Sequence, residues 1–153
     1  MIVGIIVGII LVIDQVTKYV VASNYALTNI QVIKNFFYIT YAENTGMAWS
    51  LLSGQQALFC LIASIAIGAM IWYLIYKKPD MLTQISIALL IAGAAGNLID
   101  RLFYGYVRDF LNFYIFGYDF PIFNVADMAL CIGVFVLLLA SYLEEKRNDK
   151  TAV

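Results

Sequence analysis

Four stretches of mostly apolar residues dominate this chain and limit the folds that it can adopt. They lie at residues 2–22, 57–76, 81–99 and 123–143. A helix of about 20 apolar residues is long enough to cross the ~30 Å hydrocarbon core of a bilayer. Because lipid offers no partners to backbone N–H and C=O groups, each stretch must satisfy its own hydrogen bonds as a helix. The sequence therefore predicts an all-α integral membrane protein with four transmembrane helices.

The composition is also that of a membrane protein. The 153 residues are 63% hydrophobic and only 12% charged, whereas a soluble domain carries about 25% charged residues. Nine Lys and Arg residues against ten Asp and Glu residues leave no basic field, so we expect no nucleic-acid partner. Both cysteines, Cys60 and Cys131, lie in apolar stretches and are expected to be free. We expect residues 1–153 to form a single membrane domain and to be monomeric.

The connections between the apolar stretches predict the orientation of the chain. The second and third stretches are joined by the short turn 77–81, whereas residues 23–56 and 100–122 form long loops on the opposite side. Lys and Arg are concentrated at the turn and near the carboxyl terminus. Short positively charged segments stay in the cytoplasm. We therefore expect both termini inside the cell and both long loops outside.

Histidine is absent from the sequence. Its absence excludes Ser-His-Asp and Cys-His catalysis, His-liganded zinc and histidine as a general base. Acid–base chemistry must then come from Asp, Glu, Lys, Tyr or Cys. Carboxylates close to the membrane are the first candidates, because ionisable groups are costly there and usually have a function.

The first apolar stretch contains two opposite charges. Asp14 and Lys18 are spaced i, i+4, so they lie on one helix face and can pair. A paired carboxylate stays ionised and a paired lysine stays charged, so we expect a supporting role beside a polar site. The same charges interrupt the region where a signal-peptide cleavage site would follow, and we expect this stretch to be retained as a helix.

The first long loop has the pattern of a small β-sheet. Apolar residues alternate in short runs, which is typical of half-buried strands. The alternating residues are Ile30, Val32, Phe37, Ile39 and Tyr41. Asn44 and Gly46 suit a turn because both tolerate positive φ. We predict a small extracytoplasmic antiparallel β-sheet that either caps the helices or forms a cradle whose free edge pairs with an extended peptide.

Residues 102–121 are too rich in aromatic side chains for an ordinary solvent loop. Aromatic residues gather at the membrane–water interface. We therefore predict an aromatic interfacial segment, irregular or with a short helix. It would either anchor the protein or act as a movable lid over a site between the helices.

Two aspartates are the candidates for catalysis. Asp127 lies about one turn inside the fourth apolar stretch, with Asn124 on the same helix face and no basic residue in that stretch. Asp109 lies in the middle of the aromatic segment. When two carboxylates are close they share one proton, so one can take a proton from water while the other donates to a carbonyl oxygen. The sequence thus predicts peptide hydrolysis at the membrane surface.

Asp100 is the rival to Asp109 as the second carboxylate. The adjacent Arg101 and the nearby Asn97 favour an ionised Asp100 that orients the site and does not react. Asp119 has no assigned role.

Two other chemistries are compatible with these residues. Lys18 with Ser23 or Ser50 would give a Ser-Lys dyad, but nothing in the sequence positions a serine. The carboxylates could instead bind a cation in a transporter or a channel-like membrane protein. Transporters usually show internal repeats or broken helices near the midplane, whereas these carboxylates gather at one face.

Five short motifs follow one another along the chain. They are DQxTK from Asp14 to Lys18, NxGxA with an aromatic from Asn44 to Trp49, GNLIDR from Gly96 to Arg101, VRDF from Val107 to Phe110, and FNVAD from Phe123 to Asp127. On a frame of four membrane helices, the five motifs together resemble the lipoprotein signal peptidases (signal peptidase II) of bacteria. The resemblance covers nearly the whole chain.

This resemblance implies an aspartic endopeptidase that needs no metal and no cofactor. It implies lipid-modified prolipoproteins as substrates, cut just before the diacylglyceryl-modified cysteine, and membrane lipids as further partners. It places the protein in the bacterial cytoplasmic membrane with its active site at the outer face. The catalytic pair maps onto Asp109 and Asp127. The supporting residues map onto Asp14, Lys18, Asn44, Gly46, Asn97, Asp100, Arg101 and Asn124.

One position departs from the family pattern. The residue before the first catalytic aspartate is often apolar in the family, and here it is Arg108. We expect this positive charge to lower the pKa of Asp109.

Overall fold

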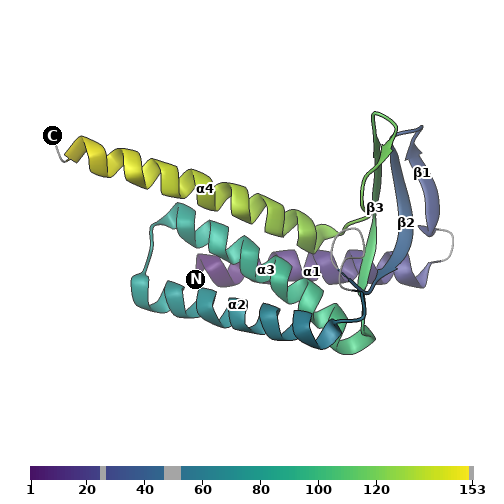
Figure 1. The fold of residues 1–153 in the computed structure, drawn as a ribbon, viewed down its shortest axis with the longest axis horizontal. Coiled ribbons are helices and arrows are strands. Elements are labelled where there is room, and N and C mark those ends of the chain that lie inside the picture. The colour runs from purple at the N-terminus through teal and green to yellow at the C-terminus, as the bar shows by residue number, and fades with distance from the viewer. Residues whose placement is uncertain (25–26, 47–52, 152–153) are drawn as a thin grey trace.

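The structure, a computed structural model, consists of long helices with a small sheet at one end of them (Figure 1). It describes residues 1–24, 27–46 and 53–151. The helices are α1 (Ile2–Ser23), α2 (Gln56–Lys77), α3 (Met81–Tyr104) and α4 (Val125–Thr151). Within the described residues, four helices are long and apolar enough to cross a membrane. The prediction of four transmembrane helices is confirmed.

Helix α3 lies at the centre of the bundle and packs against the other three helices. Small residues let α4 approach it closely, as is typical of helix pairs in membranes. A Cβ added to Gly93 would overlap the carbonyl oxygen of Ala126. The hydroxyl of Ser86, fully buried, donates to the carbonyl oxygen of Gly133 at 2.9 Å. Helices α3 and α4 therefore form a firm pair, and this pair carries Asn97 and the other polar residues of their outer ends.

The antiparallel sheet lies where α1 and α3 end and α2 and α4 begin (Figure 1). Its strand order is β1-β2-β3-β4. The strands are β1 (Asn29–Ile33), β2 (Phe37–Asn44), β3 (Val107–Ile115) and β4 (Tyr118–Asp119). Strand β2 pairs with β3, which places Ala42 opposite Asp109 and Asn44 opposite Val107. This pairing joins the two long loops into one sheet, and the predicted fold class is confirmed.

Residues 102–121 form neither an irregular segment nor a short helix. Helix α3 continues to Tyr104 and ends where Gly105 adopts a left-handed φ of 79°. The chain then enters β3, in which successive side chains point to opposite faces. Asp109 and Arg108 therefore face different surroundings. The many aromatic residues of this stretch mask the alternation that is typical of a strand.

Candidate active site

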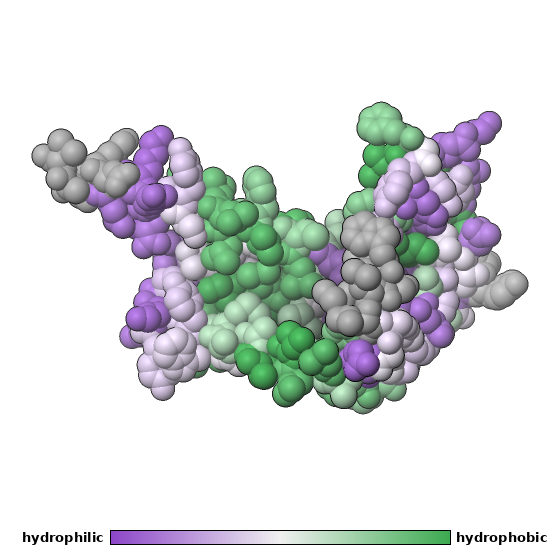
Figure 2. Space-filling model, viewed as in Figure 1, coloured by the Kyte–Doolittle hydropathy of each residue, from purple (hydrophilic) through white to green (hydrophobic). Residues whose placement is uncertain are grey.

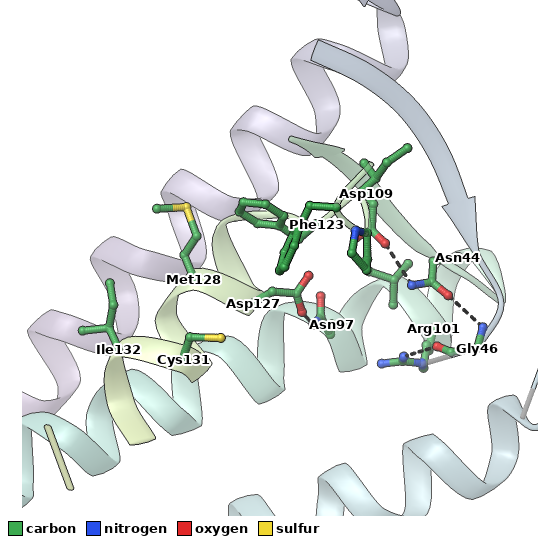
Figure 3. A pocket seen from close by; sticks show the side chains of 14 residues that line it. Asn44, Gly46, Asn97, Arg101, Asp109, Phe123, Asp127, Met128, Cys131 and Ile132 are labelled. Atoms are coloured by element: carbon green, nitrogen blue, oxygen red, sulfur yellow. Dashed lines mark hydrogen bonds between the residues drawn. The ribbon is translucent and has the colours of Figure 1, made fainter. Parts of the chain in front are cut away.

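A cavity of about 540 Å³ opens where the sheet meets α3 and α4 (Figure 3). It is lined by both candidate carboxylates, Asp109 from β3 and Asp127 from the first turn of α4. Asn44, Asn97 and Arg101 also line it. The remaining lining residues, which are mostly apolar, are Gly46, Val107, Phe120, Pro121, Ile122, Phe123, Met128, Cys131 and Ile132.

Asp109 is held by two side-chain amides. Only 2% of the residue is exposed. Its Oδ2 accepts a hydrogen bond from Nδ2 of Asn44 at 3.0 Å, and its Oδ1 accepts one from Nδ2 of Asn124 at 2.6 Å. The amide of Asn44 is itself oriented, because its Oδ1 accepts the backbone N–H of Gly46 at 2.9 Å. Strand β2 and the residue before α4 thus fix the carboxylate that β3 presents.

The surroundings of Asp109 favour its protonated form. Burial raises the pKa of Asp109 to about 7, and the nearby charge of Asp127 adds to the rise. The hydrogen bonds from Asn44 and Asn124, and the charge of Lys18, lower this pKa but do not cancel the effect of burial. A carboxyl group with such a pKa can hold a proton near neutral pH.

Asp127 is held from two directions. Nδ2 of Asn97, on α3, donates to its Oδ1 at 2.7 Å. The backbone N–H of Asn124 donates to its Oδ2 at 3.2 Å, and the backbone N–H of Asp127 donates in return to Oδ1 of Asn124 at 3.0 Å. This reciprocal pair caps the beginning of α4. The carboxylate also lies at the positive end of that helix.

Lys18 is a buried cation next to the aspartate site. Its ammonium lies 2.9 Å from Oδ2 of Asp14, so the pair predicted from the i, i+4 spacing is present. It lies 3.4 Å from Oδ2 of Asp100 and donates to Oδ1 of Asn97 at 3.1 Å. All three charged side chains are completely buried. Lys18 thereby orients the amide that contacts Asp127.

Asp14 connects α1 to the beginning of α4. Its Oδ1 accepts the backbone N–H of Ala126 at 2.9 Å, and this N–H has no partner within its own helix. Gly96 on α3 leaves room for this contact, because a Cβ there would lie 2.6 Å from Oδ2 of Asp14. Asp14 thus fixes the residue next to Asp127.

Asp100 pairs with Arg108 and not with the adjacent Arg101. Arg108 donates to Asp100 from its backbone N–H at 2.9 Å, from Nε at 3.2 Å and from Nη2 at 2.8 Å. Arg101 donates from Nη2 to the carbonyl oxygen of Gly46 at 3.2 Å, and its guanidinium carbon lies 4.9 Å from the centre of the Phe59 ring. Arg101 is not the partner of Asp100, because consecutive residues on a helix do not face each other.

The expectation that Arg108 lowers the pKa of Asp109 was wrong. The Arg108 side chain lies on the other face of β3, against Asp100 and the ring of Tyr104, whose centre is 4.4 Å from the guanidinium carbon. Nη2 of Arg108 also donates to Oε1 of Gln15 at 2.9 Å. The Arg108 charge is therefore paired with Asp100, and burial and the charge of Asp127 raise the pKa of Asp109.

Two residues near the site were given no role by the sequence. Gln15 donates from Nε2 to Oδ1 of Asp100 and to the carbonyl oxygen of Gly96, both at 3.2 Å. Its position in the first motif, DQxTK, was the sequence feature that could have indicated this role. Cys131 lines the cavity as a free cysteine. It lies four residues after Asp127, so helical periodicity alone would place it on the same face.

Part of the predicted site lies outside the described residues, namely Ala48, Trp49 and Ser50. Of the Ser-Lys alternative, only Ser23 and Lys18 can be placed. The hydroxyl of Ser23 donates to the carbonyl oxygen of Tyr19, whereas Lys18 contacts carboxylates. These two residues therefore do not form a dyad.

Membrane helices that hold two carboxylates in one cavity suit a membrane enzyme, and similar solved structures belong to this class. Two similar structures are both described as bacterial membrane enzymes studied by the in meso method. The first has a TM-score of 0.87 at 40% identity, and the match covers 95% of this chain and 90% of the chain in that structure. The second has a TM-score of 0.82 at 41% identity and covers 90% of each chain.

Sequence comparison gives the family. The family model described as signal peptidase (SPase) II matches residues 6–143. The lipoprotein signal peptidase of Staphylococcus carnosus (strain TM300) is 43% identical over 141 residues, which are 91% of this chain and 89% of that protein. The chain belongs to the signal peptidase II family, as its five motifs predicted. It is therefore a peptidase of the aspartic type and a multi-pass bacterial membrane protein, and the cation-transport alternative is not favoured.

Proposed function

We propose that this chain removes the signal peptides of lipid-modified prolipoproteins, with Asp109 and Asp127 as its catalytic pair. The observation that carries the proposal is that both carboxylates line one cavity at the end of the membrane helices. A lipid attached to the substrate cysteine would keep the scissile bond at the bilayer surface, at the level of this cavity. The apolar part of the lining suits the apolar residues of a signal peptide.

The reaction needs one ionised and one protonated carboxyl group. Asp127 is the ionised partner and accepts a proton from water while the water oxygen attacks the carbonyl carbon. Asp109 donates its proton to the carbonyl oxygen, which gives a tetrahedral diol. The carbon–nitrogen bond then breaks as Asp127 passes its proton to the cysteine nitrogen, and Asp109 recovers a proton from one hydroxyl. Both carboxyl groups return to their resting states.

The assignment of the resting proton to Asp109 rests on its surroundings. Asp109 is almost fully buried, and burial with the adjacent Asp127 charge raises its pKa to about 7. Asp127 accepts hydrogen bonds from the Asn97 amide and the backbone N–H of Asn124, and it lies at a helix amino terminus. Because two close carboxyl groups do not both ionise, these contacts stabilise the charge on Asp127 while Asp109 holds the shared proton.

The other predicted residues act by positioning. We assign the side-chain amides of Asn44, Asn97 and Asn124 to holding the two carboxylates, because each donates a hydrogen bond to one of them. Arg101 holds the carbonyl of Gly46 at the rim of the cavity. The residues that hold the helices and the sheet together beneath the pair are Asp14, Lys18 and Asp100.

We place the cavity at the outer face of the cytoplasmic membrane and both termini inside the cell. Lys77, Lys78, Lys146 and Arg147 lie in or next to the helix ends opposite the sheet, and such charges stay in the cytoplasm. We further propose a monomeric enzyme surrounded by membrane lipids, because one chain supplies both carboxylates and the proposed reaction needs no residue from a second copy.

The proposal is tested by replacing each aspartate in full-length protein reconstituted in vesicles. Asp109→Asn and Asp127→Asn should each abolish cleavage of a diacylglyceryl-modified prolipoprotein, as followed by the size of the product. Asp119→Asn, at an exposed residue on β4, is the matched control and should cleave normally. Cleavage at the wild-type rate by either of the first two variants would rule out the pair.

The substrate class needs a separate measurement with the unchanged enzyme. The same prolipoprotein without its diacylglyceryl group should be cut far more slowly, because nothing then holds the scissile bond at the bilayer surface. Equal rates on the two substrates would contradict lipid-dependent recognition while leaving the catalytic pair intact.

A further inference from the structure

The turn between β3 and β4 carries a fully exposed aromatic side chain. Phe116 is 107% exposed, and the flanking residues Ile115 and Tyr118 are 41% and 54% exposed. Exposed apolar side chains that gather in one place usually mark an interaction surface. None of these three residues lines the catalytic cavity. The proposed reaction therefore does not account for them.

Phe116 also occupies a backbone position that disfavours it. Phe116 and Gly117 have φ values of 51° and 81°, as in a two-residue hairpin turn with positive φ at both positions. Such positions prefer Asn, Asp or Gly, and a bulky residue there is costly. The turn between β1 and β2 meets a similar requirement with Asn35, at a φ of 56°. A costly residue at an exposed turn indicates a role for its side chain.

The two turns lie at the same end of the sheet, away from the cavity. In Figure 1 they extend past the helices on the side of α4. The backbone N–H of Tyr114 donates to the carbonyl oxygen of Phe36 at 2.8 Å, which joins the two hairpins next to their turns. The helices beside them expose large apolar side chains, such as Phe135 and Leu138 on α4, as lipid contact requires. In a bilayer that surrounds these helices, the turns would overhang the lipid that borders α4.

The tips of the two turns differ in polarity in the direction that a bilayer requires. Figure 2 shows hydrophobic side chains at the end of the β3–β4 hairpin, on the side toward the helices, and hydrophilic ones on the β1 side. The exposed residues Lys34 and Asn35 form the tip of the β1–β2 turn, where Phe116 and Gly117 stand in the other turn, while Ile33 and Phe36 beside this tip are 52% and 44% exposed. Aromatic residues on one side and polar residues on the other are typical of segments that lie in the membrane interface.

We propose that Phe116 inserts into the headgroup region of the bilayer and holds the outer end of the sheet against the membrane. The partner is the lipid beside α4, because the apolar side of the turn is directed toward the helices and their lipid-exposed surface. Because β3 carries both Phe116's hairpin and Asp109, this contact fixes the tilt of β3 relative to the bilayer. An effect of this tilt on catalysis by Asp109 rests on the proposed function, whereas the insertion of Phe116 into the bilayer does not.

Insertion is tested with a tryptophan probe in full-length protein. Phe116→Trp and, as the matched control on the neighbouring turn, Asn35→Trp are reconstituted in phosphatidylcholine vesicles. Some vesicles carry a nitroxide quencher on an acyl carbon close to the headgroup. After subtraction of the wild-type emission, the probe at position 116 should be quenched at least about twofold more than the probe at position 35. Equal quenching of the two probes, or none at position 116, would overturn the proposal.

The role of the contact is tested with Phe116→Asn, a substitution that suits the positive φ. The melting temperature should not fall, because Asn is preferred at this turn position. In vesicles, KM for the lipidated prolipoprotein should rise about threefold or more with kcat unchanged, and Phe116→Leu should restore most of the loss. An unchanged KM would overturn this role. The quenching measurement needs no catalysis, so it stays informative even if the proposed function is wrong.

Discussion

Nδ2 of Asn124 lies 2.6 Å from Oδ1 of Asp109. The Oδ1 of the same side chain accepts the backbone N–H of Asp127 at 3.0 Å, and its Nδ2 is also 3.2 Å from Oδ1 of Asn97. Asn124 is completely buried. One amide therefore contacts the strand that carries the first aspartate and the helix that carries the second, and it determines how the two carboxyl groups are placed.

Replacement of Asn124 by Ala should lower kcat and shift the pH profile. Asp109 becomes charged as it gives its proton to the substrate, and loss of a hydrogen bond to a charged group costs on the order of 1.5–3 kcal/mol, or roughly tenfold to a hundredfold in rate. This hydrogen bond lowers the pKa of Asp109, so its loss should move the decline of kcat/KM at high pH to a higher pH. A purely structural role would reduce the rate without moving the profile.

The stability of the protein should depend on pH through Asp109. Burial raises the pKa of Asp109 from 3.8 to about 7, so the folded state binds its proton more tightly than the unfolded state. The proton on Asp109 therefore adds to the free energy of unfolding, fully below about pH 4, and this contribution is lost as the pH rises through about 7. Its size is on the order of 2–4 kcal/mol. The melting temperature of Asp109→Asn relative to wild type should therefore increase between about pH 5 and about pH 8.

Asp119→Asn is the matched control for this titration, since it makes the same chemical change at an exposed residue of β4. A difference between Asp109→Asn and wild type that stays constant across this pH range would show that Asp109 does not retain its proton in the folded protein.

Chelators should leave the activity unchanged. In the proposed reaction Asp127 activates the water and Asp109 protonates the carbonyl oxygen, so no step requires a metal ion. The measurement is the initial rate with a lipidated prolipoprotein before and after treatment with EDTA. A loss of rate that is restored by one added metal would replace this mechanism with a metal-dependent one.

The interior of the helix bundle offers a matched pair of glycine substitutions. A Cβ at Gly96 would lie 2.6 Å from Oδ2 of Asp14 and 3.1 Å from Cβ of Ala126, whereas nothing lies within 4 Å of a Cβ at Gly68. Gly96→Ala should displace Asp14 from the first turn of α4, lower the melting temperature and reduce kcat. Gly68→Ala should be neutral or slightly stabilising, because Ala is the better helix former. Similar behaviour of the two variants would contradict this packing.

Much of this arrangement could be predicted from the sequence because it depends on local spacing. The length of each apolar stretch determines the helices, and the i, i+4 spacing of Asp14 and Lys18 determines their pairing. Asn124 and Asp127 are likewise neighbours on one helix turn. The convergence of Asp109 and Asp127 could only be proposed through the order of the motifs, because it depends on how β3 lies against α4.

Contacts between distant elements could not be predicted in this way. The partner of Asp100 is set by the fold: β3 follows α3 through the turn at Gly105 and brings Arg108 back over the helix end. Sequence adjacency favoured Arg101, whose side chain is directed elsewhere. The strand itself was missed because its pairing with β2 stabilises it more than any local preference of its residues.

The buried pair of Asp100 and Arg108 should behave as a coupled unit. Arg108→Met would leave Asp100 with Lys18, 3.4 Å away, as its remaining cation, and Asp100→Asn would leave Arg108 without its carboxylate. Breaking one side of a buried ion pair costs about 3–5 kcal/mol, whereas replacing both sides costs much less. Each single variant should therefore lower the melting temperature more than Asp100→Asn combined with Arg108→Met. If the two single effects simply add in the double variant, the pair contributes no coupling and β3 must be held by its other contacts.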